Sequence, residues 1–185
     1  MGGFLGAGKT TLILTAARLL QQRGLRASVI LNDQGGDLVD THYASAMGVD
    51  CDQVTGGCFC CRFPDLVDAA NRLLEFQPDV IFAEAVGSCT DIVATTLRPL
   101  TREYRDRFTV APLTVVLHPQ ASFDNSDLDF LYRNQVAEAD ILFARGGKRA
   151  SLARQAALRG CSGRRQDARY RLSTLRRGRG GRLPG

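Results

Sequence analysis

The sequence lacks tryptophan, and no apolar run approaches the roughly 20 residues that a membrane-spanning helix needs. Its start also lacks the basic segment followed by an apolar segment that is typical of a secretory signal. These absences predict a cytoplasmic protein with no membrane partner. The length of 185 residues, with 44% hydrophobic and 23% charged residues, is typical of one soluble globular domain.

Acidic residues are scarce in only one part of the chain. Residues 1–144 hold 11 Lys and Arg against 18 Asp and Glu, a net charge of −7, whereas residues 145–185 hold 13 against 1, a net charge of +12. This second segment is rich in Arg and Gly and loses apolar periodicity after Leu158. We therefore expect a folded domain over 1–144 and a disordered tail over 145–185. Nucleic-acid binding by the tail is disfavoured, because aromatics are absent there beyond Tyr170.

Apolar residues follow two spacings along residues 1–144. Helical spacing covers 10–20, 64–76, 92–100 and 128–139, and short strand-like runs cover 27–31, 79–83, 113–117 and 141–144. Residues 32–61 are rich in glycine and are predicted to form loops. Helices that alternate with buried strands predict an α/β fold, a doubly wound and mostly parallel sheet with helices on both faces.

The strongest motif is GFLGAGKT at residues 3–10, which matches the phosphate-loop pattern G-x-x-x-x-G-K-[ST]. Its glycines let successive backbone N–H groups face an anion, and the following helix adds its N-terminal dipole. We expect Lys9 to reach the β- and γ-phosphates and Thr10 to hold Mg²⁺. The predicted nucleotide-binding residues are Gly3, Gly6, Ala7, Gly8, Lys9, Thr10, Thr11 and Gly87. Because so few residues precede this loop, the first strand is expected to be largely missing.

Three of the six cysteines fall within four positions, in the segment GGCFCC at residues 56–61. Thiolates are soft ligands that suit Zn²⁺ or similar ions. Because adjacent cysteines tend to point apart, we expect two of Cys58, Cys60 and Cys61 to share an ion. The candidates for the remaining ligands are Cys89, Cys51, His42 or a carboxylate. Buried apolar thiols and a redox pair are the alternative interpretations.

The predicted strand over 79–83 ends at Glu84, and Gly87 follows three positions later. In phosphate-loop enzymes an acidic residue at this point faces Mg²⁺ and the attacking water, and a glycine amide contacts the γ-phosphate. We interpret Glu84 and Lys9 as catalytic residues and Glu84 as a partner of Thr10 at the magnesium ion. The alternative for Glu84 is a solvated charge at the rim of the sheet.

Together, GGFLGAGKTT, NDQGG after the strand over 27–31, GGCFCC and EAVGSCTD resemble the CobW-type metallochaperone GTPases, relatives of the nickel-insertion GTPases for urease and hydrogenase. The resemblance covers about residues 1–144. It implies a GTPase that uses GTP and Mg²⁺ and delivers Zn²⁺ or Co²⁺ to a client protein, with a homodimer as a further assembly. It assigns the metal to Cys58, Cys60 and Cys61. It places Asn32 and the magnesium ligand Asp33 in a first nucleotide-sensing switch, and Glu84 and Gly87 in a second.

The chain departs from this family in two places. Its first-switch loop has Asp33, Gln34 and Gly36 where the family has Glu, an aromatic residue and Glu. After residue 144, where the family places the base-recognising N-K-x-D, the chain reads RGGKR. Because this break coincides with the loss of apolar pattern, out-of-frame translation of GC-rich DNA is favoured over a basic interaction arm for residues 145–185. A small-molecule P-loop kinase and a metal buffer or thiol sensor without turnover are the competing functions.

Overall fold

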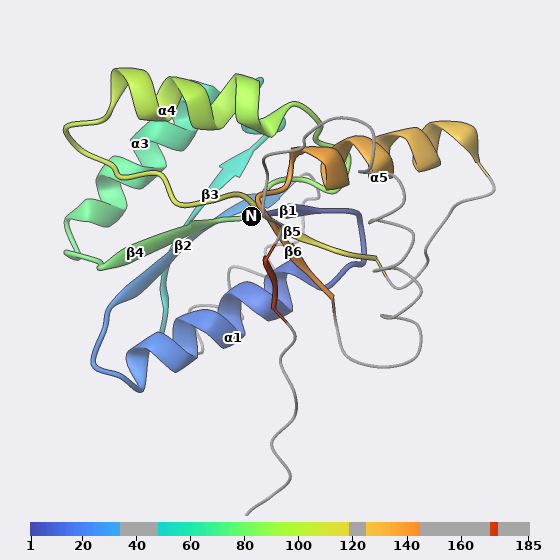
Figure 1. Cartoon of the computed structure of the whole chain (residues 1–185). Coiled ribbons are helices and arrows are strands. Elements are labelled where there is room, and N and C mark those ends of the chain that lie inside the picture. Colours follow the sequence, from blue (N-terminus) through green and yellow to red (C-terminus); the bar gives the residue numbers. More distant parts are fainter. Residues whose placement is uncertain (34–47, 119–124, 145–170, 174–185) are drawn as a thin grey trace, which may run out of the picture.

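The computed structural model describes residues 1–33, 48–118, 125–144 and 171–173 (Figure 1). Its strands are β1 (Gly2–Gly3), β2 (Ala27–Asp33), β3 (Asp50–Thr55), β4 (Val80–Ala83), β5 (Thr114–Val116), β6 (Ile141–Phe143) and β7 (Arg171–Ser173). Its helices are α1 (Lys9–Gln21), α3 (Phe63–Leu74), a π-helical turn (Val93–Leu97) that continues into α4 (Arg98–Glu103), and α5 (Ser126–Glu138). None of the helices described combines the length and apolar character needed to cross a membrane.

The strands form two parallel groups, β3-β2-β4 and β1-β5-β6-β7. Met1 joins the two groups, because its amino group donates to the Ala83 carbonyl at 2.6 Å and its carbonyl accepts from the Ala85 N–H at 3.0 Å. The joined order is β3-β2-β4-β1-β5-β6-β7. The predicted parallel α/β sheet is thus confirmed, and its first strand, β1, spans two residues. The phosphate loop that follows β1 leaves from the middle of this sheet.

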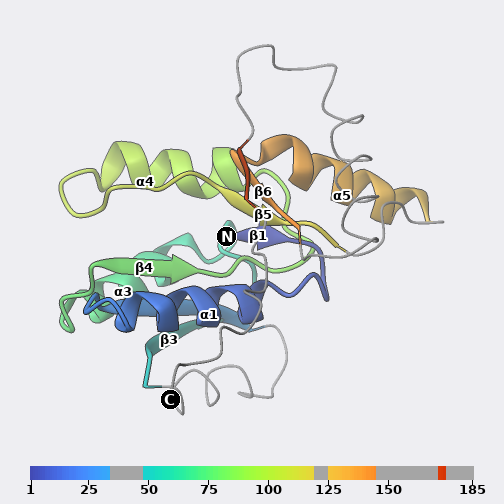
Figure 2. The ribbon, with the colours of Figure 1, turned by 60° about the horizontal axis from the view of Figure 1, so that its bottom comes forward.

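Helices cover both faces of the sheet, as a doubly wound fold requires. Ala27, Val29 and Leu31 of β2 share one buried cluster with α1, whereas Ile30 of β2 belongs to a second cluster with α3 and α5. This alternation follows from the two-residue period of a strand. Figure 1 shows α1 on one side of the sheet and α3, α4 and α5 on the other, and Figure 2 places α1 and α5 on opposite sides of β1, β5 and β6.

Local capping explains where two helices begin and end. The predicted helix over 128–139 begins at Ser126, because the Asn125 Oδ1 accepts hydrogen bonds from the Asp127 and Leu128 backbone N–H groups at 2.9 and 3.1 Å. Helix α1 stops before Gly24, which has a φ of 79° and so adopts the left-handed conformation that terminates many helices. The helical spacing located both elements, and the caps set their ends.

Two strands lie where no strand was predicted. β3 falls within residues 32–61, which were predicted to form loops, and it pairs with β2 from Ser28↔Asp50 to Asp33↔Thr55. It is an edge strand in which only Val54 is buried, so its sequence lacks an apolar pattern. β7 falls within the predicted disordered tail and pairs with β6. The other tail residues, 145–170 and 174–185, lie outside the described residues.

Candidate functional site

The phosphate loop depends on glycine at three points. Gly3 ends β1 so close to β5 that a Cβ there would lie 2.6 Å from the Val116 carbonyl oxygen. Gly6 and Gly8 have φ angles of 73° and 92°, in the left-handed region that other residues rarely adopt. Between them, the Ala7 N–H donates to the Phe4 carbonyl at 3.1 Å and closes the turn. The motif therefore forms the tight loop that the sequence predicts.

Lys9 and Thr10, the first residues of α1, meet Glu84 at the end of β4. The Lys9 side chain is only 6% exposed, and its Nζ lies 3.8 Å from Glu84 Oε1 and donates to the Phe4 carbonyl at 3.4 Å. The Thr10 hydroxyl donates to the same Glu84 oxygen at 3.1 Å. The structure thus brings together the predicted phosphate-binding, magnesium-binding and catalytic side chains. The buried Lys9 cation is balanced by the Glu84 carboxylate.

The loop after β4 packs directly against the phosphate loop. A Cβ on Gly87 would lie 2.6 Å from the Leu5 backbone nitrogen, so only glycine permits this approach. The two loops border a cavity of about 720 Å³, which is within the usual range for ligand sites. Its walls include the predicted residues Gly6, Gly8, Lys9, Thr10, Thr11, Glu84 and Gly87, together with Asn32, Leu128 and Leu131.

Two predicted nucleotide-site residues, Gly3 and Ala7, do not line these walls, and a third, Asp33, is described only by its backbone. Gly3 lies in β1, and Ala7 is buried within the phosphate loop. Asp33 ends β2, but its side chain lies outside what the structure describes, so magnesium binding by Asp33 stays a prediction. The rest of the first-switch loop and His42 belong to residues 34–47, which are also outside the described residues.

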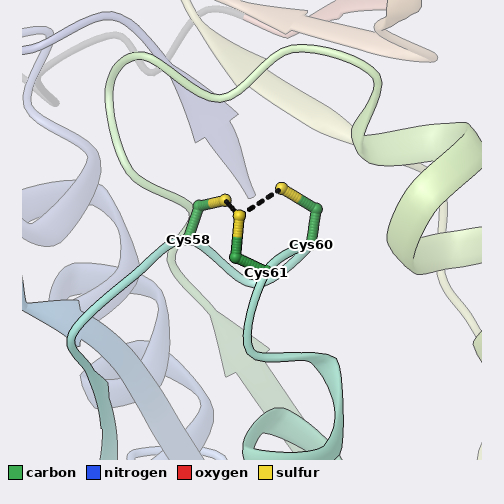
Figure 3. Close-up of side chains that lie close together, drawn as sticks. All are labelled: Cys58, Cys60 and Cys61. Atoms are coloured by element: carbon green, nitrogen blue, oxygen red, sulfur yellow. Dashed lines mark hydrogen bonds between the residues drawn. The ribbon is translucent and has the colours of Figure 1, made fainter.

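Cys58, Cys60 and Cys61 gather their sulfur atoms at one point of the loop between β3 and α3 (Figure 3). The Cys58 and Cys61 sulfurs lie 3.2 Å apart, those of Cys60 and Cys61 lie 3.9 Å apart, and all three are within 4.8 Å of one another. The expectation that the adjacent Cys60 and Cys61 point apart is therefore wrong, whereas the number of thiols that share an ion stays a prediction. The reason is a tight turn, in which the Cys61 and Arg62 N–H groups both donate to the Cys58 carbonyl.

The structure also separates two candidates for the remaining ligand. Cys51 lies on β3 and packs with the cluster around α1, whereas Cys58 and Cys60 pack against the cluster on the other face of the sheet. Cys89 belongs to that second cluster and is 5% exposed. Burial and, next, the nearby Cys58 thiolate raise the pKa of Cys89 to about 11. Of these two cysteines, Cys89 is the one placed to join the trio.

The three clustered thiols are not equivalent as acids. Partial burial by itself raises the pKa of the Cys58 thiol, but its interactions with Cys60 and Cys61 outweigh burial and lower the pKa to about 7. The interaction with Cys58, followed by burial, raises the pKa of Cys60 to about 12. Cys58 is therefore the more acidic of these two thiols.

We expect iodoacetamide to alkylate Cys58 before Cys60 in the metal-free protein. Because the thiolate is the reacting form, the rate at Cys58 should rise with pH and reach half its maximum near pH 7. Cys60 should still react slowly at about pH 9. Peptide mass spectrometry after timed labelling gives both rates. Equal rates at the two residues across neutral pH would contradict this order of thiol acidity.

Gln135 on α5 is a residue of the site that sequence reasoning missed. Its side chain is 2% exposed, and its Nε2 donates to the carbonyl oxygens of Gly87 and Cys89 at 2.7 and 3.0 Å. It thereby fixes the loop that runs from the cavity to the buried thiol. A polar residue between apolar positions of a helix is the only signal in the sequence, and it does not indicate a partner 46 to 48 residues away.

We expect Gln135→Leu to lower the free energy of unfolding by about 2–3 kcal/mol, because each buried carbonyl left without a donor costs roughly 1–3 kcal/mol. Urea denaturation followed by circular dichroism measures this loss. Asn134→Leu also replaces a side-chain amide by leucine, at the preceding and less buried position, and should lower the free energy of unfolding by less than about 1 kcal/mol. Equal losses in the two variants would show that the Gln135 amide does not secure the loop.

Several solved structures share the fold of this chain. HypB from Helicobacter pylori in complex with nickel has a TM-score of 0.64 and 17% identity, with 94% of this chain and 76% of that chain covered. The Zn(II)-bound YjiA GTPase from E. coli has a TM-score of 0.61 and 19% identity, with 96% of this chain and 56% of that chain covered. These likenesses establish the P-loop fold.

Curated relatives match at the level of sequence. The zinc chaperone YjiA of Escherichia coli is 37% identical over 91 residues, 48% of this chain and 28% of its own length. The zinc chaperone YeiR of the same organism is 29% identical over 156 residues, 80% of this chain and 46% of its own length. The match thus spans less than half of each relative. The family model described as CobW/HypB/UreG, nucleotide-binding domain, matches residues 1–171, and the chain belongs to this family.

Proposed function

We propose that this chain binds and hydrolyses GTP and that its nucleotide state controls a Zn²⁺ or Co²⁺ ion carried on the GGCFCC loop for delivery to a client protein. The observation that carries the proposal is the loop after β4. This loop contributes Glu84 and Gly87 to the cavity and continues to Cys89, which lies in the same buried cluster that Cys58 and Cys60 pack against. A change at one site therefore has a short covalent route to the other.

The residues around the cavity fit a magnesium nucleotide. Left-handed glycines and the N-terminus of α1 favour an anion, and Lys9 supplies a buried cation for the phosphates. The Thr10 hydroxyl and the Glu84 carboxylate offer the oxygen ligands that Mg²⁺ prefers. When bound, magnesium would neutralise charge on the β- and γ-phosphates. Glu84 would orient the attacking water, directly or through the metal's water shell. Turnover without a partner is expected to be slow.

The thiol cluster fits a soft cation as cargo. Three sulfurs within 4.8 Å of one another make a sulfur-rich site that suits Zn²⁺. Cys89, in the buried cluster that Cys58 and Cys60 pack against, is proposed as the fourth donor. Zinc chaperoning is supported by the zinc chaperones among the relatives. Cobalt as an alternative cargo, the client protein and a homodimer belong to the same proposal. GTP is proposed over ATP because solved neighbours of this fold include a GTPase.

The test is to titrate the purified 185-residue chain with Zn²⁺ in the presence of Mg²⁺ and either a non-hydrolysable GTP analogue or GDP. We expect about one ion per chain and a dissociation constant that differs at least about fivefold between the two nucleotides. Equal affinities would overturn the proposal. GTP turnover, measured as released phosphate, would distinguish the proposed GTPase from a metal buffer without turnover. Transfer of phosphate to a small acceptor molecule would instead identify a kinase.

A thiol sensor is the second candidate function, and one observation favours it. The Cys58 and Cys61 sulfurs are 3.2 Å apart, and the pKa of Cys58 is lowered to about 7 by its interactions with Cys60 and Cys61. Mild oxidation could therefore join this pair as a disulfide. The test measures GTP turnover after oxidation of the zinc-free chain and, separately, after addition of zinc. A change with oxidation but none with zinc would favour the thiol sensor.

A further inference from the structure

Asn32, near the end of β2, contacts the cavity and the thiol loop with one side chain. It lines the cavity beside Lys9 and Glu84. Its Nδ2 donates to the Val54 carbonyl on β3 at 2.9 Å and to the Gly57 carbonyl, directly before Cys58, at 2.8 Å. A single amide therefore ties the end of β2 to the backbone from which the cysteine cluster starts.

The orientation of this amide follows from its partners. Both neighbours of Nδ2 are carbonyl oxygens, which only accept hydrogen bonds, so the NH₂ group must face them and Oδ1 must face away. The Oδ1 atom is buried, and among the residues that the structure describes it has no hydrogen-bond partner. An unpaired buried carbonyl is unfavourable, so it gains from a donor or a cation next to it. A hydrated Mg²⁺ ion beside a bound triphosphate would offer a water molecule as the donor and its own positive charge.

The second connection between the cavity and the thiol cluster is the loop after β4, which is held by a side chain that does not line the cavity. The Gly87 and Cys89 carbonyls are both bound by Gln135, which belongs to α5 and not to the cavity wall. This contact holds the loop after β4 to α5 at Gly87 and Cys89. Of the two connections, the Asn32 amide is the one that belongs to a cavity-lining residue and also donates to the thiol loop.

We propose that Asn32 is the positioning residue that transmits the nucleotide state to the thiol cluster. This inference rests on the proposed function, and it assigns the coupling to one side chain. With a magnesium triphosphate bound, Oδ1 gains its partner, the amide is held in one orientation, and Gly57 keeps the cysteine turn in the gathered form. With GDP, the amide loses that partner and the turn is freer to open and release its ion.

The test compares zinc dissociation constants in the GTP-analogue and GDP states for wild type, Asn32→Ala and Asn32→Asp. Asn32→Asp keeps the shape but replaces the donor group with an acceptor facing two carbonyls. We expect the ratio of the two constants to fall from at least about fivefold to within twofold of unity in both variants. Asn71→Ala, which removes a half-buried asparagine on α3 that accepts from Arg107, is the matched control and should keep the wild-type ratio.

The outcomes separate this inference from the proposed function. A purely structural role would weaken zinc binding equally in both nucleotide states and leave the ratio unchanged, which would overturn the inference alone. A wild-type ratio of one would overturn the proposed function and the inference together. If Asn32→Ala does not fold, Asn32→Ser replaces it in the test. The serine hydroxyl is too short to bridge both carbonyls, so the ratio of the two zinc dissociation constants should again fall to within twofold of unity.

Discussion

Replacing Cys60 by serine is expected to raise the dissociation constant for Zn²⁺ by roughly a hundredfold. Structural zinc sites bind with about 10–16 kcal/mol, so each of four ligands contributes about 3 kcal/mol. Cys60 shares a sulfur cluster within 4.8 Å with Cys58 and Cys61, and serine provides a hard, protonated oxygen in place of a thiolate. Cys58→Ser and Cys61→Ser should give losses of the same size. Competition with a chromogenic chelator measures all three.

Cys51→Ser is the matched control for these variants. Cys51 is also partly buried, but it packs on the α1 face of the sheet and away from the cluster. It should therefore keep zinc affinity within about threefold of wild type. Nucleotide affinity should stay unchanged in all four variants, because none of these cysteines lines the cavity. Equal weakening by Cys51→Ser would mean that the GGCFCC loop is not the zinc site.

Cys89→Ser determines whether the site uses three or four thiolates. A loss close to that of Cys60→Ser would identify Cys89 as the fourth ligand. Because Cys89 is buried within the apolar core, its serine variant also places a hydroxyl there, so the free energy of unfolding must be measured alongside. A variant that is destabilised but keeps its zinc affinity would restrict the ligand set to the trio.

The phosphate loop was predictable because its requirements are local. Left-handed glycines, the start of α1 and the acidic strand end at Glu84 each depend on a few neighbouring residues, so a short motif contains them. The converging cysteines were harder to predict, because the argument from adjacency left out the turn closed by the Cys58 carbonyl. That turn brings together side chains that an extended backbone would separate.

Long-range contacts account for what the sequence did not indicate. The amide of Asn32 binds carbonyls 22 and 25 residues away, and that of Gln135 binds carbonyls 46 and 48 residues away. No local pattern specifies such partners. Strand β3 also depends on a long-range contact, because its pairing with β2 forms it although its own sequence has no apolar repeat. The family resemblance was placed on about residues 1–144, and the family match extends to residue 171.

Lys9→Met is expected to affect stability and nucleotide binding through two separable causes. In the nucleotide-free protein it removes the cation that lies 3.8 Å from the partly buried Glu84 carboxylate, which is 13% exposed. Breaking such a pair costs about 3–5 kcal/mol of the free energy of unfolding. The same change removes the buried charge offered to the phosphates, and GTP affinity should fall by roughly a hundredfold or more. Urea denaturation and fluorescent GTP titration measure the two effects.

The double variant Lys9→Met with Glu84→Gln separates these causes. Glutamine removes the carboxylate charge that has lost Lys9, and its side-chain carbonyl still accepts a hydrogen bond from the Thr10 hydroxyl. Most of the lost stability should therefore return. Nucleotide affinity should not return, because the cation for the phosphates is still missing. A double variant that regained GTP binding would show that Lys9 acts only by balancing Glu84. One that regained neither stability nor affinity would show instead that Lys9 supports the phosphate loop through the Phe4 carbonyl.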